Sequence, residues 1–429
     1  MSICQLPHLI SELPHAINQQ VTVGGWIHAV RNLGGVQFVV LRDGSATVQL
    51  VLREQPLISL HPETVVRVTG IVSSEPRAPQ GIEIRDPEVE ILSKAANPLP
   101  IDVAGQFPMA SLPTRLNNAA VALRHPHAQN WIKITAHLVK GFRDTLSSLG
   151  FVEIHTPKIL ETPSESGSNV FQIEYFGRPA YLAQSPQFYK QMMVGVLGRV
   201  FEVGPVFRAE PHDTARHLSQ YTSLDVEIGF IKDHHTVMDL AQHVVVGMLQ
   251  AAHTHFSDEA YDWPLLPETF PVVHFQDAMA MISHAIGEDV TGEPDLSPAH
   301  EAWLGDWARK ELGSDFLFVE GYPALKRPFY THPDPGNSQY TRSFDLIFRG
   351  QELITGGQRL HRFADYVEAM KRHGLSERGL SGYLAAFRYG MPPHGGFAIG
   401  LERFVARLTG VSNIRDVTLF PRDMKRLQP

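Results

Sequence analysis

Short apolar runs that alternate with polar positions dominate the first hundred residues. Five of them have the length of a strand, and turns rich in Gly, Asp or Pro separate them: 21–30, 36–42, 47–52, 65–72 and 82–92. A period of two places alternate side chains on one face of a strand. Five such strands within about 75 residues, with a helical spacer near residues 56–60, predict a small OB-type β-barrel.

The pattern changes after residue 100. Apolar residues at helical spacing between 126 and 149 predict an amphipathic helix that ends at Gly150. Apolar runs at 200–206 and 224–230 predict two buried strands joined as a hairpin, and helical patterns near 234–252 and 298–312 precede strand-like runs at 316–319, 344–348 and 396–399. We therefore expect an α+β chain with a barrel at 1–100, a hinge at 101–125, and a domain at 126–429 built from an antiparallel sheet flanked by helices.

Composition excludes several classes of protein. A hydrophobic content of 43% and a charged content of 19% are typical of a globular protein, and no apolar run reaches the length of a membrane span. The single cysteine, Cys4, excludes an internal disulfide framework and favours a reducing cytoplasm. His234 and His235 lack the spacing of a zinc site and are interpreted as surface residues. With a net charge of −8, any RNA contact has to come from local basic patches.

The hairpin between the two buried runs carries most of the candidate chemistry. It places Arg208, Glu210, Arg216 and His217 before Asp225. Guanidinium groups bind phosphate oxygens bidentately and stay charged, so the segment suits a phosphate ligand. Taken alone, it would more readily fit a salt-bridged surface hairpin. Four further segments decide between the two interpretations: GFVEIHTP at 150–157, LAQSPQFYKQ at 182–191, ELITGGQR at 352–359 and GLERF at 400–404.

In this order, the five segments resemble the three signature motifs of class II aminoacyl-tRNA synthetases, with the amino-acid pocket of the aspartyl branch. The resemblance covers nearly the whole chain and implies that the barrel binds an anticodon. It implies a homodimer formed through the segment at 150–159, in which Pro157 suits a strand edge. About 120 residues separate Glu227 from Asp345, too few for the insertion of bacterial-type enzymes, so the chain resembles the compact archaeal and eukaryotic type.

The resemblance implies that ATP and Mg²⁺ activate a carboxylate as an adenylate, without a protein nucleophile. It assigns catalytic roles to Arg208, Glu352 and Arg403, and adenine would lie between Tyr221 and Arg403. The implied metal ligands are Asp345, Glu352 and Thr355, although Asp345 alone would also fit a solvated strand carboxylate. The implied ATP-binding set is Arg208, Ala209, Glu210, Arg216, His217, Leu218, Tyr221, Glu352, Gly400, Leu401, Glu402 and Arg403.

The implied amino-acid pocket selects L-aspartate. Lys190 and Arg359 match the positions that hold the side-chain carboxylate, and asparagine would leave a buried charge unpaired, at a cost of about 3–5 kcal/mol. The full aspartate set is Glu165, Gln187, Lys190, Arg208, Asp225, Thr355 and Arg359. Two positions depart from the family pattern: Ser166 replaces a glycine, and Gln220 replaces a glutamate.

The choice of tRNA is expected to depend on the barrel. Trp26, Phe38 and Gln49 are candidates for contacts with unpaired bases, with Arg31 and Arg42 near the RNA backbone, and Phe38 fits the barrel core equally well. His28 and Pro79 occupy two anticodon-reading positions and resemble the non-discriminating form, which charges tRNA-Asp and tRNA-Asn and is linked to an amidotransferase. The alternatives are a strictly tRNA-Asp-specific enzyme in which these positions drifted, an asparaginyl-tRNA synthetase, and a non-catalytic RNA-binding paralogue.

Overall fold

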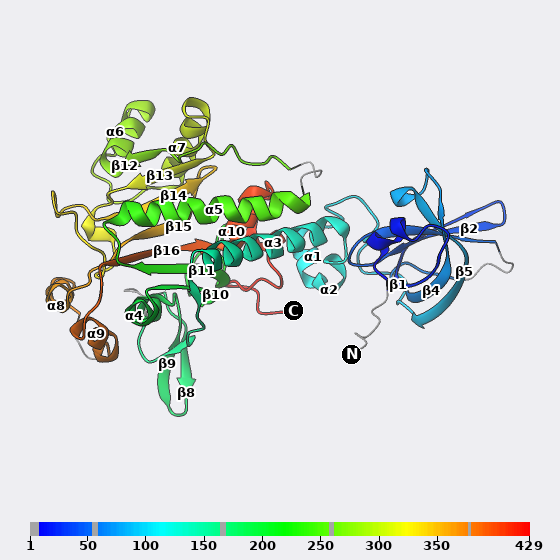
Figure 1. Cartoon of the computed structure of the whole chain (residues 1–429), viewed down its shortest axis with the longest axis horizontal. Helices are drawn as coiled ribbons and strands as arrows, with labels where there is room; N and C mark the ends of the chain where they lie inside the picture. The colour runs from blue at the N-terminus through cyan, green and yellow to red at the C-terminus, as the bar shows by residue number, and fades with distance from the viewer. Residues whose placement is uncertain (1–7, 54–58, 164–168, 257–260, 376–378) are drawn as a thin grey trace. The chain divides into compact units, whose positions relative to one another are not determined.

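The computed structural model describes residues 8–53, 59–163, 169–256, 261–375 and 379–429 (Figure 1). Contacts within the chain divide it into two units, residues 1–129 and residues 130–428. Each unit has a hydrophobic core of its own. The segment 101–125, expected as a hinge, belongs to the first unit and contains the short helices α1 (Leu112–Asn117) and α2 (Ala119–Ala122).

The first unit is a closed five-stranded barrel in the order β1-β2-β3-β5-β4, as the alternating pattern predicted. At Gly25 an added Cβ would lie 2.5 Å from the carbonyl oxygen of Arg42, so the backbones of β1 and β2 approach closely there. The helical spacer expected at 56–60 falls largely on residues outside the described ranges. The elements are η1 (Ile10–His15), β1 (Gln20–Leu33), β2 (Val36–Arg42), β3 (Thr47–Leu52), β4 (Val65–Ser74), η2 (Pro79–Gly81) and β5 (Ile82–Ser93).

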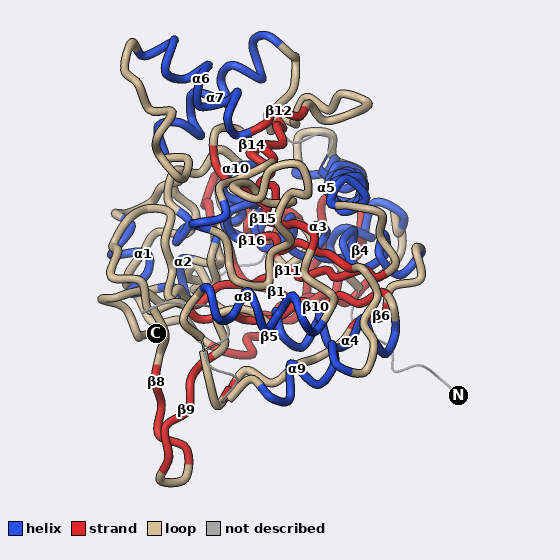
Figure 2. The backbone as a smooth tube through the Cα atoms, turned by 90° about the vertical axis from the view of Figure 1, so that its left-hand side faces the viewer, coloured by secondary structure: helices blue, strands red, loops and turns tan. Residues whose placement is uncertain are grey.

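The second unit is built on an eight-stranded sheet in the order β12-β13-β14-β15-β16-β11-β10-β6. Its strands are β6 (Val152–Glu153), β10 (Arg199–Phe207), β11 (Gln220–Gly229), β12 (Val272–His274), β13 (Phe316–Glu320), β14 (Ser343–Phe348), β15 (Gln351–Gln358) and β16 (His394–Gly400). A separate three-stranded sheet, β7-β9-β8, is formed by β7 (Ile159–Leu160), β8 (Gln172–Tyr175) and β9 (Arg178–Leu182), and its β8–β9 hairpin projects from the unit (Figure 2).

The prediction of an antiparallel sheet is confirmed for the six strands from β13 to β10, including the hairpin β10–β11. It is wrong at both edges, where β12 pairs with β13 and β6 pairs with β10 in parallel. These edge strands have only three and two residues. An apolar–polar alternation cannot be recognised over so few positions.

Helices cover the sheet of the second unit. Residues from α3 (Pro126–Ser148) and α5 (His234–Phe256) join the strands in the main core, so both helices pack on the sheet (Figure 1). The remaining helical elements are α4 (Gln187–Leu197), α6 (Phe275–Ile286), α7 (Pro298–Glu311), η3 (Ala324–Lys326), α8 (Phe363–Arg372), α9 (Ser381–Arg388), α10 (Leu401–Leu408) and η4 (Ile414–Val417). Among the described residues, no helix is both long enough and apolar enough to cross a bilayer.

Candidate active site

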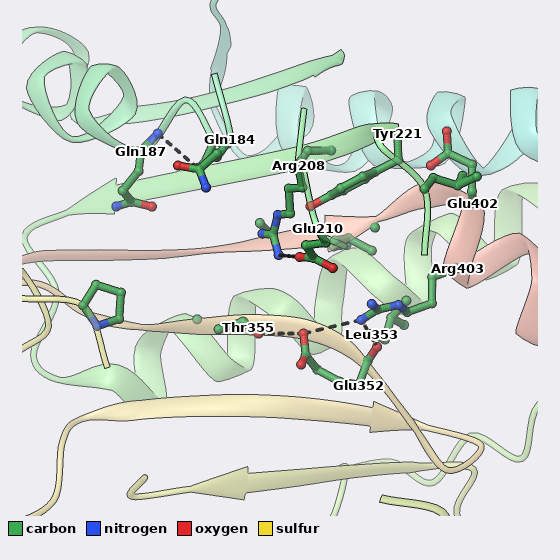
Figure 3. A pocket seen from close by; sticks show the side chains of 18 of the residues that line it. Gln184, Gln187, Arg208, Glu210, Tyr221, Glu352, Leu353, Thr355, Glu402 and Arg403 are labelled. Atoms are coloured by element: carbon green, nitrogen blue, oxygen red, sulfur yellow. Dashed lines mark hydrogen bonds and ion pairs between the residues drawn. The ribbon is translucent and has the colours of Figure 1, made fainter. Parts of the chain in front are cut away.

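One cavity of about 450 Å³ gathers side chains from segments far apart in the sequence. Its walls come from α4, the hairpin β10–β11, the strands β15 and β16, and the start of α10 (Figure 3). Fourteen residues expected from the sequence line it: Gln187, Lys190, Arg208, Glu210, Arg216, His217, Leu218, Tyr221, Glu352, Thr355, Arg359, Gly400, Glu402 and Arg403.

Five expected residues are not among those that line this cavity. Glu165 falls outside the described ranges, as does its neighbour Ser166. Leu401 is buried in the main core. Asp225 and Asp345 are almost fully buried, and the fifth residue, Ala209, bonds through its backbone N–H to the carbonyl oxygen of Asn169.

Two arginines and an aromatic ring give one end of the cavity the character of a nucleotide site. The guanidinium of Arg208 lies 5.7 Å from the ring centre of Tyr221, and its Nη1 lies 3.7 Å from Oε1 of Glu210 (Figure 3). Nη1 of Arg403 donates to the backbone oxygen of Glu352 at 2.8 Å. These contacts leave cationic groups and a flat ring in one cavity, an arrangement that suits a phosphorylated base.

The protonation of this end is set by burial. Burial lowers the pKa of His217, although Glu210 opposes the shift, so the imidazole is neutral at pH 7. Burial raises the pKa of the Tyr221 hydroxyl, which keeps the ring uncharged. Glu402 accepts from the backbone N–H of Thr222 with both carboxylate oxygens, each at 3.0 Å. Glu402 therefore joins the start of α10 to β11 beside Tyr221.

Two carboxylates on adjacent strands form a candidate metal site. Oε1 of Glu352 accepts the hydroxyl of Thr355 at 2.9 Å, and its side chain faces the cavity. Asp345 lies directly across the ladder from Thr355. Burial acts to raise the pKa of Glu352, but Arg403 and the Thr355 hydroxyl bring it below its ordinary value. Asp345 and Glu352 thus offer the hard oxygen ligands that Mg²⁺ prefers.

Asp345 forms an ion pair with an arginine side chain of the protein. Its Oδ2 accepts from Nη2 of Arg327 at 2.9 Å, whereas its Oδ1 is buried without a hydrogen-bond partner. Burial raises the pKa of this carboxyl to about 6, and the charge of Glu352 adds to the rise against the effect of Arg327. An orphaned, buried carboxylate oxygen fits a position that a metal ion completes. Arg327 itself lines the cavity.

The opposite end holds two cations and two carboxylates at close range. Nζ of Lys190 lies 2.9 Å from Oδ1 of Asp225 and 3.4 Å from Oε2 of Glu227, and Nε of Arg359 donates to Oε1 of Glu227 at 3.1 Å. Both cations line the cavity although less than a tenth of each residue is exposed. Gly396 makes room for this cluster, because a Cβ there would lie 2.1 Å from Oε2 of Glu227.

A family model described as "tRNA synthetases class II (D, K and N)" matches residues 111–424, which include the whole cavity, and a model described as "OB-fold nucleic acid binding domain" matches residues 21–92. The chain belongs to the class II tRNA synthetases. The resemblance inferred from the five sequence segments is thereby confirmed.

Relatives of this class II synthetase align over almost its full length. It is 44% identical over 427 residues to the aspartate–tRNA(Asp/Asn) ligase of Thermus thermophilus, covering 98% of this chain and 99% of the relative. It is 38% identical over 436 residues to the aspartate–tRNA(Asp) ligase of Pyrococcus furiosus, covering 98% and 99%. The crystal structure of asparaginyl-tRNA synthetase from Pyrococcus horikoshii complexed with asparaginyl-adenylate superposes with a TM-score of 0.91 at 27% identity, covering 99% and 100%. Because the fold is shared by enzymes named for two amino acids, the pocket chemistry has to distinguish them.

Several residues of the synthetase cavity were missed from the sequence. Glu227, which pairs with the lining residues Lys190 and Arg359, was given no role, although it lies two positions after Asp225 on the same strand and therefore on the same face. Arg327, Tyr330 and Thr331 also line the cavity, but they lie in the connection between β13 and β14, which carries no strand or helix period. No sequence signal pointed to them.

Behind the amino-acid end, a buried polar network joins α4, α8, α9 and β16. Nε2 of Gln191 donates to the Tyr366 hydroxyl and to Nε2 of His394, both at 3.0 Å, and the Tyr383 hydroxyl donates to Oε1 of Gln191 at 2.9 Å. His394 consequently carries its proton on Nδ1, which donates to the oxygen of Pro392 at 2.9 Å. Burial lowers the pKa of His394 to about 4, so the network is uncharged at pH 7.

In the first unit, the candidate anticodon residues share the outer side of the barrel. Trp26, His28, Phe38 and Gln49 are partly exposed and alternate with core residues, so Phe38 is not a core residue. Arg31 is exposed and lies directly across the ladder from Phe38. The expectation that Arg42 lies near the RNA backbone is wrong, because Arg42 is buried and its guanidinium bonds to Glu63 at 2.9 Å.

Proposed function

We propose that the chain is an aspartate–tRNA ligase that uses ATP and Mg²⁺. The proposal rests on one observation: Lys190 and Arg359 lie at one end of a cavity whose other end presents Arg208, Arg403 and Tyr221. One cavity thus offers a place for an acidic amino acid next to a place for a nucleotide. The names of the relatives from Thermus thermophilus and Pyrococcus furiosus support the same substrate.

The charges of the pocket favour aspartate over asparagine. Asp225 and Glu227 balance the charges of the two cations in the free pocket. Aspartate would keep that balance, because it brings a carboxylate to the cations and an ammonium group to Asp225. Asparagine would bring the ammonium group but only a neutral amide to the cations. A buried charge left without its partner costs about 3–5 kcal/mol, a factor of a hundred or more in binding.

The reaction needs positioning and charge stabilisation. An oxygen of the aspartate α-carboxylate attacks the α-phosphorus of ATP, the bond to the bridging oxygen breaks, and pyrophosphate leaves with the bonding electrons. Arg208 would hold the α-phosphate against the carboxylate, and Tyr221 and Arg403 would hold adenine. Asp345, Glu352 and Thr355 would hold Mg²⁺, which supplies neutralisation of phosphate charge when bound. The ribose hydroxyl of the tRNA terminus then attacks the acyl carbon, and AMP leaves.

Aspartate-dependent exchange of pyrophosphate into ATP tests the reaction. The wild-type protein is expected to support exchange with aspartate and at least a hundredfold less with asparagine. Preferential exchange with asparagine would identify an asparaginyl-tRNA synthetase. No exchange with either amino acid, by protein that unfolds cooperatively, would favour a non-catalytic paralogue.

We further propose that tRNA-Asp and tRNA-Asn are both charged with aspartate. Pro79, at the start of η2, has no donor for a base edge. His28 is half-buried, and burial together with Arg42 lowers its pKa, so it presents a neutral ring. Neither residue offers a cation that would separate the last base of the GUC anticodon from that of GUU. Asp-tRNA-Asn made in this way would require a separate amidotransferase.

Charging of GUC and GUU transcripts with aspartate tests this second proposal. We expect similar efficiencies for the wild type, and a preference above about a hundredfold for GUC, or 2.7 kcal/mol, would refute it. Pro79→Lys should create a preference of about 5- to 150-fold, the range of a base-specific contact. Pro76→Lys is the matched control, since Pro76 is exposed in the same connection between β4 and β5. An equal preference in both variants would mean that position 79 does not read the base.

The assembly and the compartment are also proposals. We propose a homodimer formed through the segment at 150–159, which contains the edge strand β6 and Pro157. Light scattering at micromolar concentration should give twice the chain mass of 47.8 kDa. A fully active monomer would contradict it. The single cysteine supports a cytoplasmic location.

A further inference from the structure

The strand β15 carries a β-bulge beside the candidate metal site. Its pairing with β14 runs regularly from Ser343↔Gly357 to Leu346↔Ile354, and the next pair is Ile347↔Glu352, so Leu353 is one residue too many. In a regular strand, residues three positions apart face opposite sides. Here Thr355 donates to Glu352 at 2.9 Å and both line the cavity (Figure 3). The bulge is therefore what turns Glu352 toward the nucleotide end.

A side chain from another element bonds to the backbone at this bulge. The N–H of Glu352 donates to Oε2 of Glu301 at 3.1 Å, and only 14% of the Glu301 side chain is exposed. Glu301 belongs to α7 and is not among the residues that line the cavity. Without this acceptor, the partly buried N–H of Glu352 would have lost its hydrogen bond, at a cost of about 1–3 kcal/mol.

The helix α7 is fixed at short range to the same hairpin. Gly305, one turn after Glu301, packs on the turn between β14 and β15, where an added Cβ would lie 2.3 Å from the nitrogen of Gly350. Gly350 in turn has a φ of +73° and lies against Ala302. Because the contact is made by backbone atoms, the helix cannot shift along the strand without losing it. Glu301 is thus held in place to accept from the bulge.

Glu301 also faces the segment expected to bind phosphates. Its Oε2 lies 4.0 Å from Nη1 of Arg216, which belongs to the connection between β10 and β11. One carboxylate oxygen therefore lies between the strand that presents Glu352 and the connection that presents Arg216.

We infer that Glu301 is a positioning residue for the nucleotide and its metal ion: it holds the bulge at Leu353 and so aims the Glu352 carboxylate into the cavity. It acts through Glu352 and touches no substrate itself. The inference rests on the proposed function, because it assumes that Glu352 binds Mg²⁺–ATP. It predicts that Glu301 affects metal and nucleotide binding without affecting aspartate binding.

Three variants test this role. Glu301→Ala removes the acceptor, Glu301→Gln keeps an oxygen that accepts from the N–H of Glu352, and Asp306→Ala removes an exposed carboxylate from the same helix as a control. Binding of Mn²⁺ in the presence of a non-hydrolysable ATP analogue is followed by EPR, and binding of aspartate by calorimetry. Thermal unfolding of each variant is measured in parallel.

We expect the Mn²⁺ dissociation constant to rise about tenfold in Glu301→Ala, within the cost of an unpaired N–H, and to stay within twofold of wild type in Glu301→Gln and Asp306→Ala. The aspartate constant should not change. Three results would overturn the inference: unchanged Mn²⁺ binding in Glu301→Ala, equal losses for Mn²⁺ and aspartate, or a Gln variant as weak as the Ala variant. Should Glu301→Ala fail to fold, Glu301→Leu, which fills the space of the side chain without an acceptor oxygen, takes its place. A wild type that binds no Mn²⁺ with the analogue would instead contradict the proposed function.

Discussion

Replacement of Arg359 by glutamine separates two roles that one guanidinium has in this structure. Its Nε donates to Glu227 at 3.1 Å and its Nη2 donates to the oxygen of Gly396 at 3.0 Å, while the group lines the cavity. Arg359 thus neutralises a fully buried carboxylate and, in the proposed function, also holds the aspartate side chain. Arg359→Gln is expected to lower both the stability and the use of aspartate.

The expected magnitudes follow from the partners that remain. Among the described residues, Glu227 would keep one ion-pair partner, Lys190, at 3.4 Å, and breaking a buried ion pair from one side costs about 3–5 kcal/mol of stability. A loss of the same size in aspartate binding lowers kcat/KM for aspartate by about 10²- to 10³-fold or slightly more. The KM for ATP should change less than about threefold, because Tyr221 and Arg403 lie at the other end of the cavity.

A second substitution distinguishes stability from binding. In Arg359→Gln with Glu227→Gln, no carboxylate is left uncompensated at position 227, and two neutral amides face each other. Stability should return to within about 1–2 kcal/mol of the wild type, whereas aspartate activation stays lost. In the single variant, burial acts to raise the pKa of Glu227 and one opposing cation is gone, so its deficit in stability relative to the wild type should shrink as the pH is lowered toward 5. The double variant should lack that improvement.

Pyrophosphate exchange at varied aspartate and varied ATP measures the two KM values, and urea unfolding measures stability. Arg362→Gln is the matched control, since Arg362 is an exposed arginine, with 72% of its side chain accessible, paired to Asp365 outside the cavity. A near-normal KM for aspartate in Arg359→Gln would refute the assignment of this end of the cavity. Recovery of aspartate activation in the double variant would do the same.

Three further changes test other parts of the structure. His394→Gln should reduce the loss of stability between pH 7 and pH 4.5 by about 2–3 kcal/mol in urea unfolding. The unfolded wild type takes up a proton below pH 6.5, whereas the folded imidazole, with a pKa of about 4, stays neutral. An unchanged pH dependence would show that His394 does not cause the loss. Tyr221→Leu should raise the KM for ATP about tenfold and spare that for aspartate in pyrophosphate exchange, and equal changes would contradict an adenine contact. Phe38→Ala should raise the KM for tRNA about 5- to 100-fold in aminoacylation while leaving pyrophosphate exchange intact, and loss of both would indicate a structural role.

How well the fold could be predicted depended on the length of its strands. The barrel strands and the central strands of the large sheet were predicted because each has enough residues to show a period of two, with Val21, Val23 and Ile27 on the core side of β1. The edge strands β6 and β12 were too short for any period. Their parallel pairing depends on tertiary packing, which local spacing does not encode.

Site residues that lie close together in the sequence could be predicted, whereas contacts between distant segments could not. Residues inside the quoted segments, such as Arg208 and Glu352, were found together because each segment carries several of them. The ion pair of Asp345 with Arg327 and the bond from Glu352 to Glu301 join elements whose contact is known only once the sheet is assembled. The same limit applied to Arg42, whose pairing with Glu63 changes a surface cation into a buried one.

The strand β11 shows how one local pattern can organise both ends of the cavity. Tyr221, Ser223, Asp225 and Glu227 occupy alternate positions and therefore share a face, while Leu224 and Val226 between them are buried in the main core. Six residues of strand span about 20 Å, enough to reach from the ring at the nucleotide end to the carboxylates around Lys190. The distance between the two ends is thus set by backbone geometry. A slip of one residue against β10 or β16 would turn all four side chains into the core, so the apolar pair that stabilises the sheet also fixes the alignment of the two substrates.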